Sequence, residues 1–125
     1  MESVYEFSFE RLDAWKLARQ TVVAVYKLLK QFPKDETFGM INQAKRASVS
    51  IPANLAEGSS RSSLKERNHF YEISFGSLVE LLTLMTLAND LQYISQAEYL
   101  DVRIRIQVLS KVITGLSKSI QGKPQ

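Results

Sequence analysis

Apolar residues recur at alternating three- and four-residue steps along most of the chain, the spacing that places them on one side of an α-helix. The clearest repeats lie near the two ends of the chain. The first repeat consists of Trp15, Ala18, Val22, Val25, Leu29 and Phe32. The second consists of Tyr99, Val102, Ile106, Leu109, Ile113, Leu116 and Ile120. Seven-residue repeats of this kind form the seam along which the helices of a bundle pack.

Breaks in the pattern divide the chain into four segments. Pro33 ends the first, because the residue before a proline leaves the helical region, and Gly58 with the serines after it marks the next link. Ser63 and Ser95 are each followed three residues later by glutamate, the spacing of a capping box at a helix start. The expected helices cover residues 9–32, 37–59, 64–91 and 96–121. With such short links, residues 1–125 are expected to form one all-α domain, an antiparallel up-down-up-down four-helix bundle.

The second expected helix carries two stripes. One is an apolar seam of Ile41, Ala44, Ser48, Ile51 and Leu55, and the other is a polar stripe of Gln43, Arg46, Ser50, Asn54, Glu57 and Arg61. Pro52 lacks a backbone donor and its ring clashes with the preceding turn, so we expect the helix to be kinked or broken near it.

The polar stripe has two interpretations. In the structural one, its charged residues form ion pairs while Ser50 and Asn54 satisfy carbonyls exposed at the proline. In the functional one, Arg46 and Arg61 bind phosphate or base edges, to which the guanidinium fork is suited. We favour the structural interpretation, because Glu57 within the stripe would repel a phosphate.

The third expected helix is apolar on more than one side. Its apolar positions include Phe70, Ile73, Phe75, Leu78, Val79, Leu81, Leu82, Leu84, Met85, Leu87 and Ala88. A helix of a lone bundle keeps one side in water, so the excess indicates burial against another subunit. Gly76 lies in the middle of this helix, where we expect a close backbone approach to compensate for its cost of about 1 kcal/mol relative to alanine.

Composition narrows the functional classes. The 125 residues contain no cysteine, which excludes disulfides, thiol catalysis and zinc-thiolate sites, and is consistent with a reducing cytoplasm, where we expect the protein. The first 13 residues are acidic and lack the apolar core of a secretory signal. The longest apolar-rich run, residues 77–88, contains Glu80 and is too short to span a bilayer, so no membrane association is expected.

No motif for catalysis stands out. Glu66 and His69 have the Glu-x-x-His spacing of di-metal carboxylate bundles, but such a site needs a second copy, and His69 is the only histidine. No phosphate cradle or dinucleotide fingerprint is present either. We expect neither an enzyme nor a bound metal or cofactor.

Charge is segregated along a chain whose net charge is only +3. Residues 1–13 carry four acids and one base, whereas residues 102–125 carry five bases and no acid. Such segregation guides association with an anionic partner, but it also arises when chain ends or subunits complement each other, the interpretation we place slightly ahead. The candidate nucleic-acid contacts are Arg46, Arg61, Arg103, Arg105, Lys111 and Lys118.

Four stretches resemble the four-helix bundle proteins encoded in intervening sequences of bacterial 23S ribosomal RNA, sometimes labelled S23 ribosomal proteins. They are FERLDAWKLAR (residues 9–19), residues 32–61, FYEISFGSLVEL (residues 70–81) and GLSKSI (residues 115–120). The most specific part is the combination Gln43, Arg46, Ser50, Ile51, Pro52, Asn54, Ala56, Glu57, Gly58 and Arg61.

The resemblance implies an antiparallel bundle that assembles into a ring of five copies, without a known catalytic activity. In shape it is similar to the accessory variability proteins of diversity-generating retroelements, which bind nucleic acid and a reverse transcriptase. The leading hypothesis is therefore a non-enzymatic homo-oligomer, a homopentamer, that binds structured RNA or DNA through a repeated basic surface. The alternative is a protein-interaction scaffold or accessory ring with no nucleic-acid role.

Overall fold

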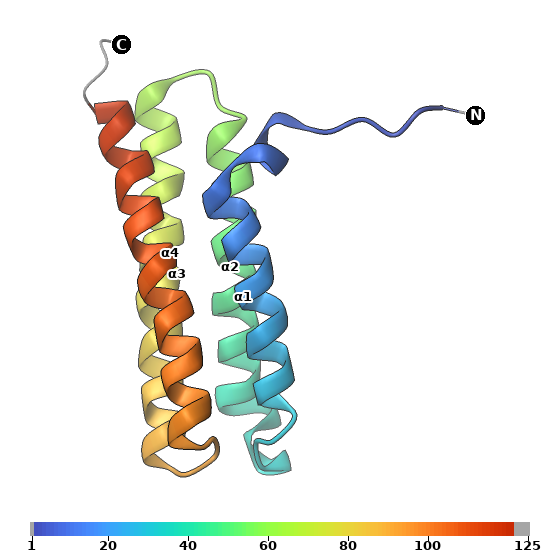
Figure 1. Ribbon diagram of the computed structural model, residues 1–125, viewed down its shortest axis with the longest axis vertical. Helices are drawn as coiled ribbons and strands as arrows, with labels where there is room; N and C mark the ends of the chain where they lie inside the picture. The colour runs from blue at the N-terminus through green and yellow to red at the C-terminus, as the bar shows by residue number, and fades with distance from the viewer. Residues whose placement is uncertain (1, 122–125) are drawn as a thin grey trace.

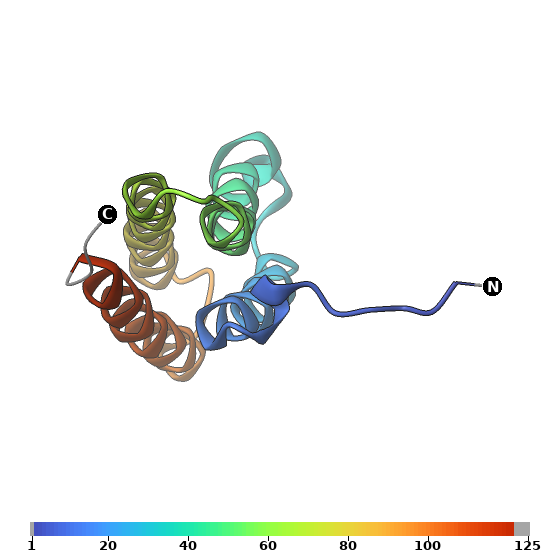
Figure 2. The same cartoon turned by 90° about the horizontal axis from the view of Figure 1, so that it is seen from above.

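The computed structural model describes residues 2–121, which form four long helices and no strand. The long helices are α1 (Asp13–Leu29), α2 (Asn42–Ser59), α3 (Leu64–Asp90) and α4 (Gln96–Gln121), and the short helical turns are η1 (Ser8–Arg11), η2 (Lys34–Glu36) and η3 (Thr37–Ile41). Figure 1 shows the long helices side by side, each running opposite to the one before it. Seen from above, they stand at the corners of a square (Figure 2). The all-α four-helix fold expected from the sequence is confirmed, while residues 1 and 122–125 of the expected domain lie outside the described residues.

The first helix is shorter than expected at both ends. Leu12 adopts extended angles (φ −69°, ψ 125°), which separates the single turn η1 from α1. At the other end, Lys30, Gln31 and Phe32 donate to carbonyls three residues back, so the chain continues as a tighter turn up to the proline.

Pro52 does not break the second helix, because α2 continues through it from Asn42 to Ser59. Of the two expected alternatives, a kink or a break, the break does not occur, and a kink at Pro52 stays a prediction. The non-helical angles lie earlier, at Gly39 (φ −108°, ψ −112°) inside η3, which is why α2 begins at Asn42 instead of residue 37. The Glu36 carboxylate accepts a hydrogen bond from the Met40 amide (3.2 Å) and fixes this irregular turn.

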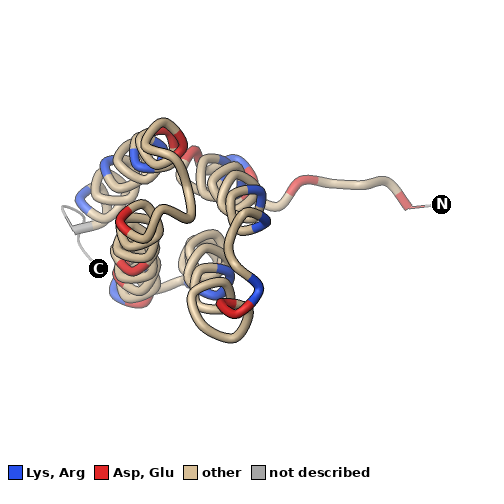
Figure 3. The backbone as a smooth tube through the Cα atoms, turned by 90° about the horizontal axis from the view of Figure 1, so that it is seen from below, with Lys and Arg blue, Asp and Glu red and all other residues tan. Residues whose placement is uncertain are grey.

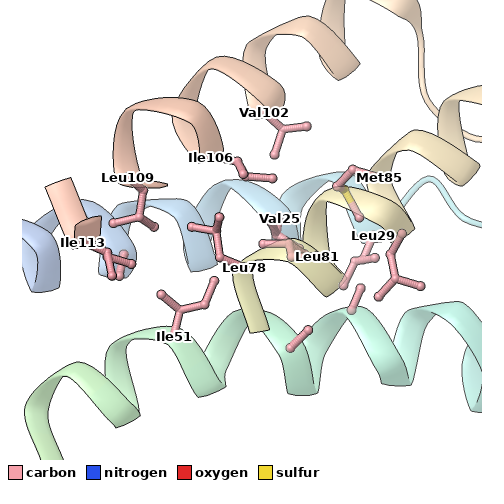
Figure 4. Packing of buried hydrophobic residues seen from close by; sticks show 14 of the residues in the cluster. Val25, Leu29, Ile51, Leu78, Leu81, Met85, Val102, Ile106, Leu109 and Ile113 are labelled. Carbon is pink, nitrogen blue, oxygen red and sulfur yellow. The ribbon is translucent and has the colours of Figure 1, made fainter. Parts of the chain in front are cut away.

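The core lies along the axis of the bundle and receives side chains from every long helix (Figure 4). The expected α4 seam is buried except for the half-buried Leu116. In α1 the seam shifts slightly, since Thr21 is buried while Trp15 and Val22 are half-buried. The buried hydroxyl of Thr21 donates to the Leu17 carbonyl (2.8 Å), so its polar atom has a partner.

Helices α2 and α3 make the most extensive contact in the bundle. Gly58 is buried at their crossing, and a Cβ atom there would lie 2.8 Å from the Tyr71 ring and 3.1 Å from the Arg67 carbonyl oxygen. The prediction of a close backbone approach at Gly76 is wrong for the described chain. Gly76 is exposed, and a Cβ atom added to it would meet nothing within 4 Å. Gly58, not Gly76, is the position where the bundle requires glycine.

The outward side of α3 carries several exposed apolar residues, next to the exposed acids Glu72 and Glu80. Ile73, Phe75, Val79 and Leu87 are all exposed, while Leu78, Leu81 and Met85 of the same helix are buried in the core. As the sequence predicts, α3 has more apolar surface than one bundle covers.

Residues 2–7, called here the N-terminal arm, extend away from the bundle (Figures 1 and 2). Val4 and Tyr5 are 101% and 70% exposed. Where the arm meets η1, the Phe7 amide donates to the Glu10 carboxylate (2.8 Å) and the Phe7 ring stacks on Phe9 (5.8 Å between centroids). The start of the bundle therefore fixes the direction in which the arm leaves it.

Candidate nucleic-acid interface

The six basic residues predicted to contact nucleic acid lie on three different surfaces. Arg103, Lys111 and Lys118 are separated by eight and seven residues, about two helical turns each, so they share one side of α4. All three are exposed. We call these three residues the α4 basic stripe.

Arg103 is held in place by a hydrogen-bonded chain that reaches α3. Its Nη1 donates to the Tyr99 hydroxyl (2.7 Å), which lies 3.0 Å from the Thr86 Oγ1 of α3. The bond with Thr86 and then the bond with Arg103 lower the pKa of Tyr99, against an opposing effect of burial. Arg103 therefore lies on the α3 side of α4, with its guanidinium oriented by a buried phenol.

Arg105 lies on the opposite flank of α4, toward α1. Its Nε is 3.3 Å from the Asp101 carboxylate one turn earlier, and both side chains are largely exposed. Together with Lys16, Arg19 and Lys27 of α1, Arg105 lines a groove of about 950 Å³ between the two helices, called here the α1–α4 groove.

The three α1 bases in this groove were not among the predicted site residues. They recur within one helix whose only acid is Asp13, a signal that a count of charges at the two chain ends misses. Taken together, α1 and α4 carry seven Lys or Arg and three Asp or Glu. In contrast, α2 and α3 together carry four Lys or Arg and five Asp or Glu. Figure 3 shows the basic residues along α4 and the acidic ones on α3. One half of the bundle is therefore basic.

The remaining two predicted bases belong to the α2–α3 side. Arg61 Nη2 forms an ion pair with Glu57 (2.9 Å), and its guanidinium lies 5.0 Å from the centroid of the Phe70 ring. The Arg67 side chain in turn donates to the Arg61 carbonyl (2.6 Å). Arg61 thus contacts residues of both α2 and α3, while 41% of its side chain stays exposed.

Arg46 occupies a second groove, of about 500 Å³, that α2 and α3 form with Gln43, Ser50, Ser77 and Glu80 in its lining. Arg46 takes part in none of the ion pairs seen among residues 2–121. With Glu80 in the same lining, the groove has mixed charge and is less suited to phosphate than the α4 basic stripe.

Hydrogen bonds explain several other residues of the polar stripe. Asn54 Nδ2 donates to the Ser50 carbonyl (2.8 Å) and to its Oγ (2.9 Å), while Ser77 of α3 donates to the same Oγ (2.8 Å). Next to them, the buried Ser74 hydroxyl donates to the Ile51 carbonyl (2.9 Å), immediately before Pro52. These bonds tie α3 to the stretch of α2 that contains the proline.

The Glu66 and His69 pair lies at the start of α3, with both side chains exposed. Glu66 donates its amide to Ser63 Oγ (3.3 Å), which caps the helix. Within the part of the chain that the structure describes, no group of three or more His, Cys, Asp or Glu residues is placed to hold a metal ion.

By length and composition alone, α3 is long and apolar enough to cross a membrane. The sequence argument, which considered only residues 77–88, therefore underestimated the length of the apolar stretch within α3. A core helix of a bundle meets the same criteria, and 33% of the apolar window of α3 is buried in the bundle. The absence of a membrane role stays a prediction.

Comparison with solved structures finds a similar bundle in a protein of unknown function from the S23 ribosomal protein family of Bacteroides thetaiotaomicron. The two share 20% sequence identity with a TM-score of 0.78, over 84% of this chain and 98% of the other. No curated protein matches the chain. The sequence model of the family described as 23S rRNA-intervening sequence protein matches residues 10–115, which include α1, α2, α3 and most of α4 but not the N-terminal arm. The chain therefore belongs to the 23S rRNA-intervening sequence protein family.

Proposed function

We propose that the chain is a non-enzymatic protein that assembles with copies of itself and binds structured RNA, or nucleic acid more generally, through the α4 basic stripe. The observation that carries the proposal is the stripe itself. Arg103, Lys111 and Lys118 are exposed along about 22 Å of one side of α4, while both acids of that helix, Glu98 and Asp101, lie toward α1. A line of cations of this kind neutralises phosphates independently of sequence.

Self-association supports the proposal in two ways. The exposed apolar side of α3 is the kind of surface that stable protein contacts cover. In addition, several copies of one short stripe bind a long anion far more tightly than one copy does. We propose five copies, the number that the family resemblance implies, and a cytoplasmic location.

The test is an RNA titration at a series of salt concentrations. The probe is a fluorescein-labelled RNA hairpin, and binding is followed by anisotropy with the unmodified protein and with Lys111→Glu. The unmodified protein is expected to bind at low salt and to weaken steeply as salt rises. Lys111→Glu is expected to weaken binding and to reduce the slope of log K against log salt by about one, because one phosphate contact is lost.

Lys65→Glu is the matched control, because Lys65 is an exposed lysine at the start of α3 and lies outside the stripe. Both variants change the net charge equally, so an equal loss of affinity would show a general charge effect and contradict a defined stripe. An assembled protein that retains no RNA at low salt would contradict RNA binding itself and would favour the protein-interaction scaffold.

A further inference from the structure

The N-terminal arm combines apolar side chains with negative charge and has little to pack against in its own bundle. Val4, Tyr5 and Phe7 are exposed, and Glu2 and Glu6 are its charged residues. The centroids of the Tyr5 and Phe7 rings lie 4.9 Å apart. Phe7 in turn contacts Phe9, and Phe9 contacts Trp15, so the four rings form a continuous row. Exposed apolar side chains that lie next to one another, unlike single ones, are typical of an interaction surface.

The α1–α4 groove has the complementary character. Apolar side chains of Val23, Ala24, Leu28 and Ala97 contribute to its lining, between the bases Lys16, Arg19, Lys27 and Arg105. Its two acids already have partners. Asp101 pairs with Arg105, while Glu98 accepts hydrogen bonds from the Ser95 amide (2.9 Å) and from Gln31 (2.6 Å).

The lysines of the groove keep their charge available. Lys16 and Lys27 form none of the ion pairs seen within residues 2–121. Arg19 instead lies over the Trp15 ring, 5.4 Å from its centroid. An acidic segment with aromatic side chains therefore finds both an apolar surface and unpaired cations in this groove.

We infer that the N-terminal arm of one copy lies in the α1–α4 groove of a second copy. The lengths agree, since six extended residues span about 20 Å and the α1 side of the groove, from Lys16 to Lys27, spans about 17 Å. In the contact, Val4 and Tyr5 cover the apolar lining, and Glu2 and Glu6 lie near the lysines. Glu6 exchanges its exposed pair with Arg11, 3.7 Å long in the lone chain, for partners in the groove.

The arm does not suit the groove of its own chain. It leaves the bundle beside the start of α1 and points away from α4, whereas the α4 part of the groove is the beginning of that helix, at the opposite end of the bundle (Figures 1 and 2). To enter its own groove, the arm would have to reverse at Phe7, where the bond to Glu10 and the stacking on Phe9 fix its direction.

The arm contact presupposes the self-association proposed above and says how neighbouring copies recognise each other. Arm and groove are different surfaces, so every copy gives one arm and receives one, which makes a head-to-tail contact. A head-to-tail contact closes into a ring when the rotation between copies allows it. The arm lies outside residues 10–115, the part of the chain that the family model matches.

Disulfide cross-linking tests the inference directly, because the natural chain has no cysteine. Full-length protein carrying Tyr5→Cys is mixed with protein carrying Val23→Cys and a mass tag, and the mixture is oxidised mildly. The expected product is a mixed disulfide of one tagged and one untagged chain, in excess over either like pair. Val49→Cys is the matched control, since Val49 is an α2 valine of similar exposure outside the groove, and it should give little mixed product.

Charge reversal adds a second readout. Lys16→Glu with Lys27→Glu should remove the mixed cross-link, and Glu2→Lys with Glu6→Lys on the arm of the other chain should restore it. Circular dichroism checks that the variants keep their helices. Failure to restore the cross-link would contradict the charge pairing.

The outcomes separate this inference from the proposed function. A multimer by light scattering that gives no mixed disulfide above the Val49→Cys level overturns the arm contact and leaves self-association intact. A single chain that carries both Tyr5→Cys and Val23→Cys and forms only an internal disulfide overturns it as well, in favour of an arm folded on its own groove. A monomer at all concentrations overturns both, whereas loss of RNA binding alone leaves the arm contact standing.

Discussion

At the scale of single residues, Gly58 shows how one missing side chain sets the distance between two helices. Gly58→Ala places a Cβ atom 2.8 Å from the Tyr71 ring and 3.1 Å from the Arg67 carbonyl, and a backbone carbonyl cannot move aside as a side chain can. We expect a net loss of about 1–3 kcal/mol in the free energy of unfolding, because overpacking exceeds the gain in helix propensity of about 1 kcal/mol. Urea unfolding followed by circular dichroism measures it.

Gly115→Ala provides the control for this substitution. Gly115 also lies inside a helix, α4, but a Cβ atom there would meet nothing within 4 Å. Only the propensity gain applies, so this variant should be more stable than the natural protein by up to about 1 kcal/mol. Destabilisation of both variants to the same extent would show that packing at Gly58 is not the cause.

Glu98 links the stability of the start of α4 to pH. Its carboxylate accepts a hydrogen bond from the Ser95 amide and another from Gln31, and these bonds, the Ser95 bond first, hold the pKa of Glu98 below its ordinary value. A lowered pKa in the folded state gives stability that is present above the ordinary glutamate pKa, about 4.3, and is lost as the pH falls through the folded value. Glu98→Gln should therefore lower Tm at pH 7, and the difference from the natural protein should shrink as the pH falls below that range.

Ser95→Ala serves as the comparison for the pH series. It removes the hydroxyl that caps the Glu98 amide (3.1 Å), at a cost of about 1 kcal/mol, but it removes no ionisable group. The decrease in Tm caused by Ser95→Ala should therefore depend less on pH than the decrease caused by Glu98→Gln. A Tm difference for Glu98→Gln that stays constant from neutral to strongly acidic pH would show that the carboxylate charge contributes nothing at this site.

At the scale of whole elements, α2 and α3 are joined by hydroxyl groups as well as by apolar contact. The buried Ser74 hydroxyl reaches across to the Ile51 carbonyl (2.9 Å) in the turn of α2 that ends at Pro52. Ser74→Ala is expected to lower the free energy of unfolding by about 1–2 kcal/mol, because a buried carbonyl loses a donor. Ser119→Ala, which removes an exposed hydroxyl bonded to its own helix (2.8 Å to the Leu116 carbonyl), should change it by less than about 0.5 kcal/mol. Equal effects in chemical denaturation would contradict a specific tie between the helices.

The elements could be predicted from the sequence to the extent that local spacing determines them. The heptad repeat of α4 gives its bounds because each apolar residue faces the same core. Gly58 and Gly76 could not be distinguished in this way, since both lie inside helices and only the distance to the neighbouring helix decides which one must be glycine. The irregular turn at Gly39 was likewise not predicted, because it depends on the Glu36 side chain folding back onto Met40.

The candidate site was predictable in part. Arg103 and Arg105 are two residues apart, so about 200° of helical rotation separates them and helical geometry alone assigns them to opposite flanks. The i,i+4 pair of Glu57 and Arg61 is equally visible in the sequence. What the sequence does not show is which helices lie next to each other. The α1–α4 groove appears only when Lys16 and Lys27 of α1 are placed beside Arg105.

At the scale of the whole molecule, the proposed assembly uses two separate surfaces, the exposed apolar residues of α3 and the N-terminal arm. The arm contact is small and depends on charge, so it gives direction more than strength. The side of α3 around Val79 and Leu87 supplies apolar area, from which most of the association free energy is expected.

Introducing charge on α3 tests this division of roles. Val79→Glu with Leu87→Glu puts two carboxylates on the exposed side of α3, where both residues are about half exposed and the core is untouched. The variant should keep its helical circular dichroism but show the mass of a single chain by light scattering, because burying unpaired charges opposes association. Val49→Glu on α2 is the control and should leave the mass unchanged.

The concentration dependence of Tm gives a second measurement. Another copy of the chain that binds only the folded state stabilises it by mass action, so Tm of the natural protein should rise with protein concentration, and Tm of the α3 variant should not. An α3 variant with unchanged mass and an unchanged concentration dependence of Tm would show that this side of α3 faces solvent in the assembled protein.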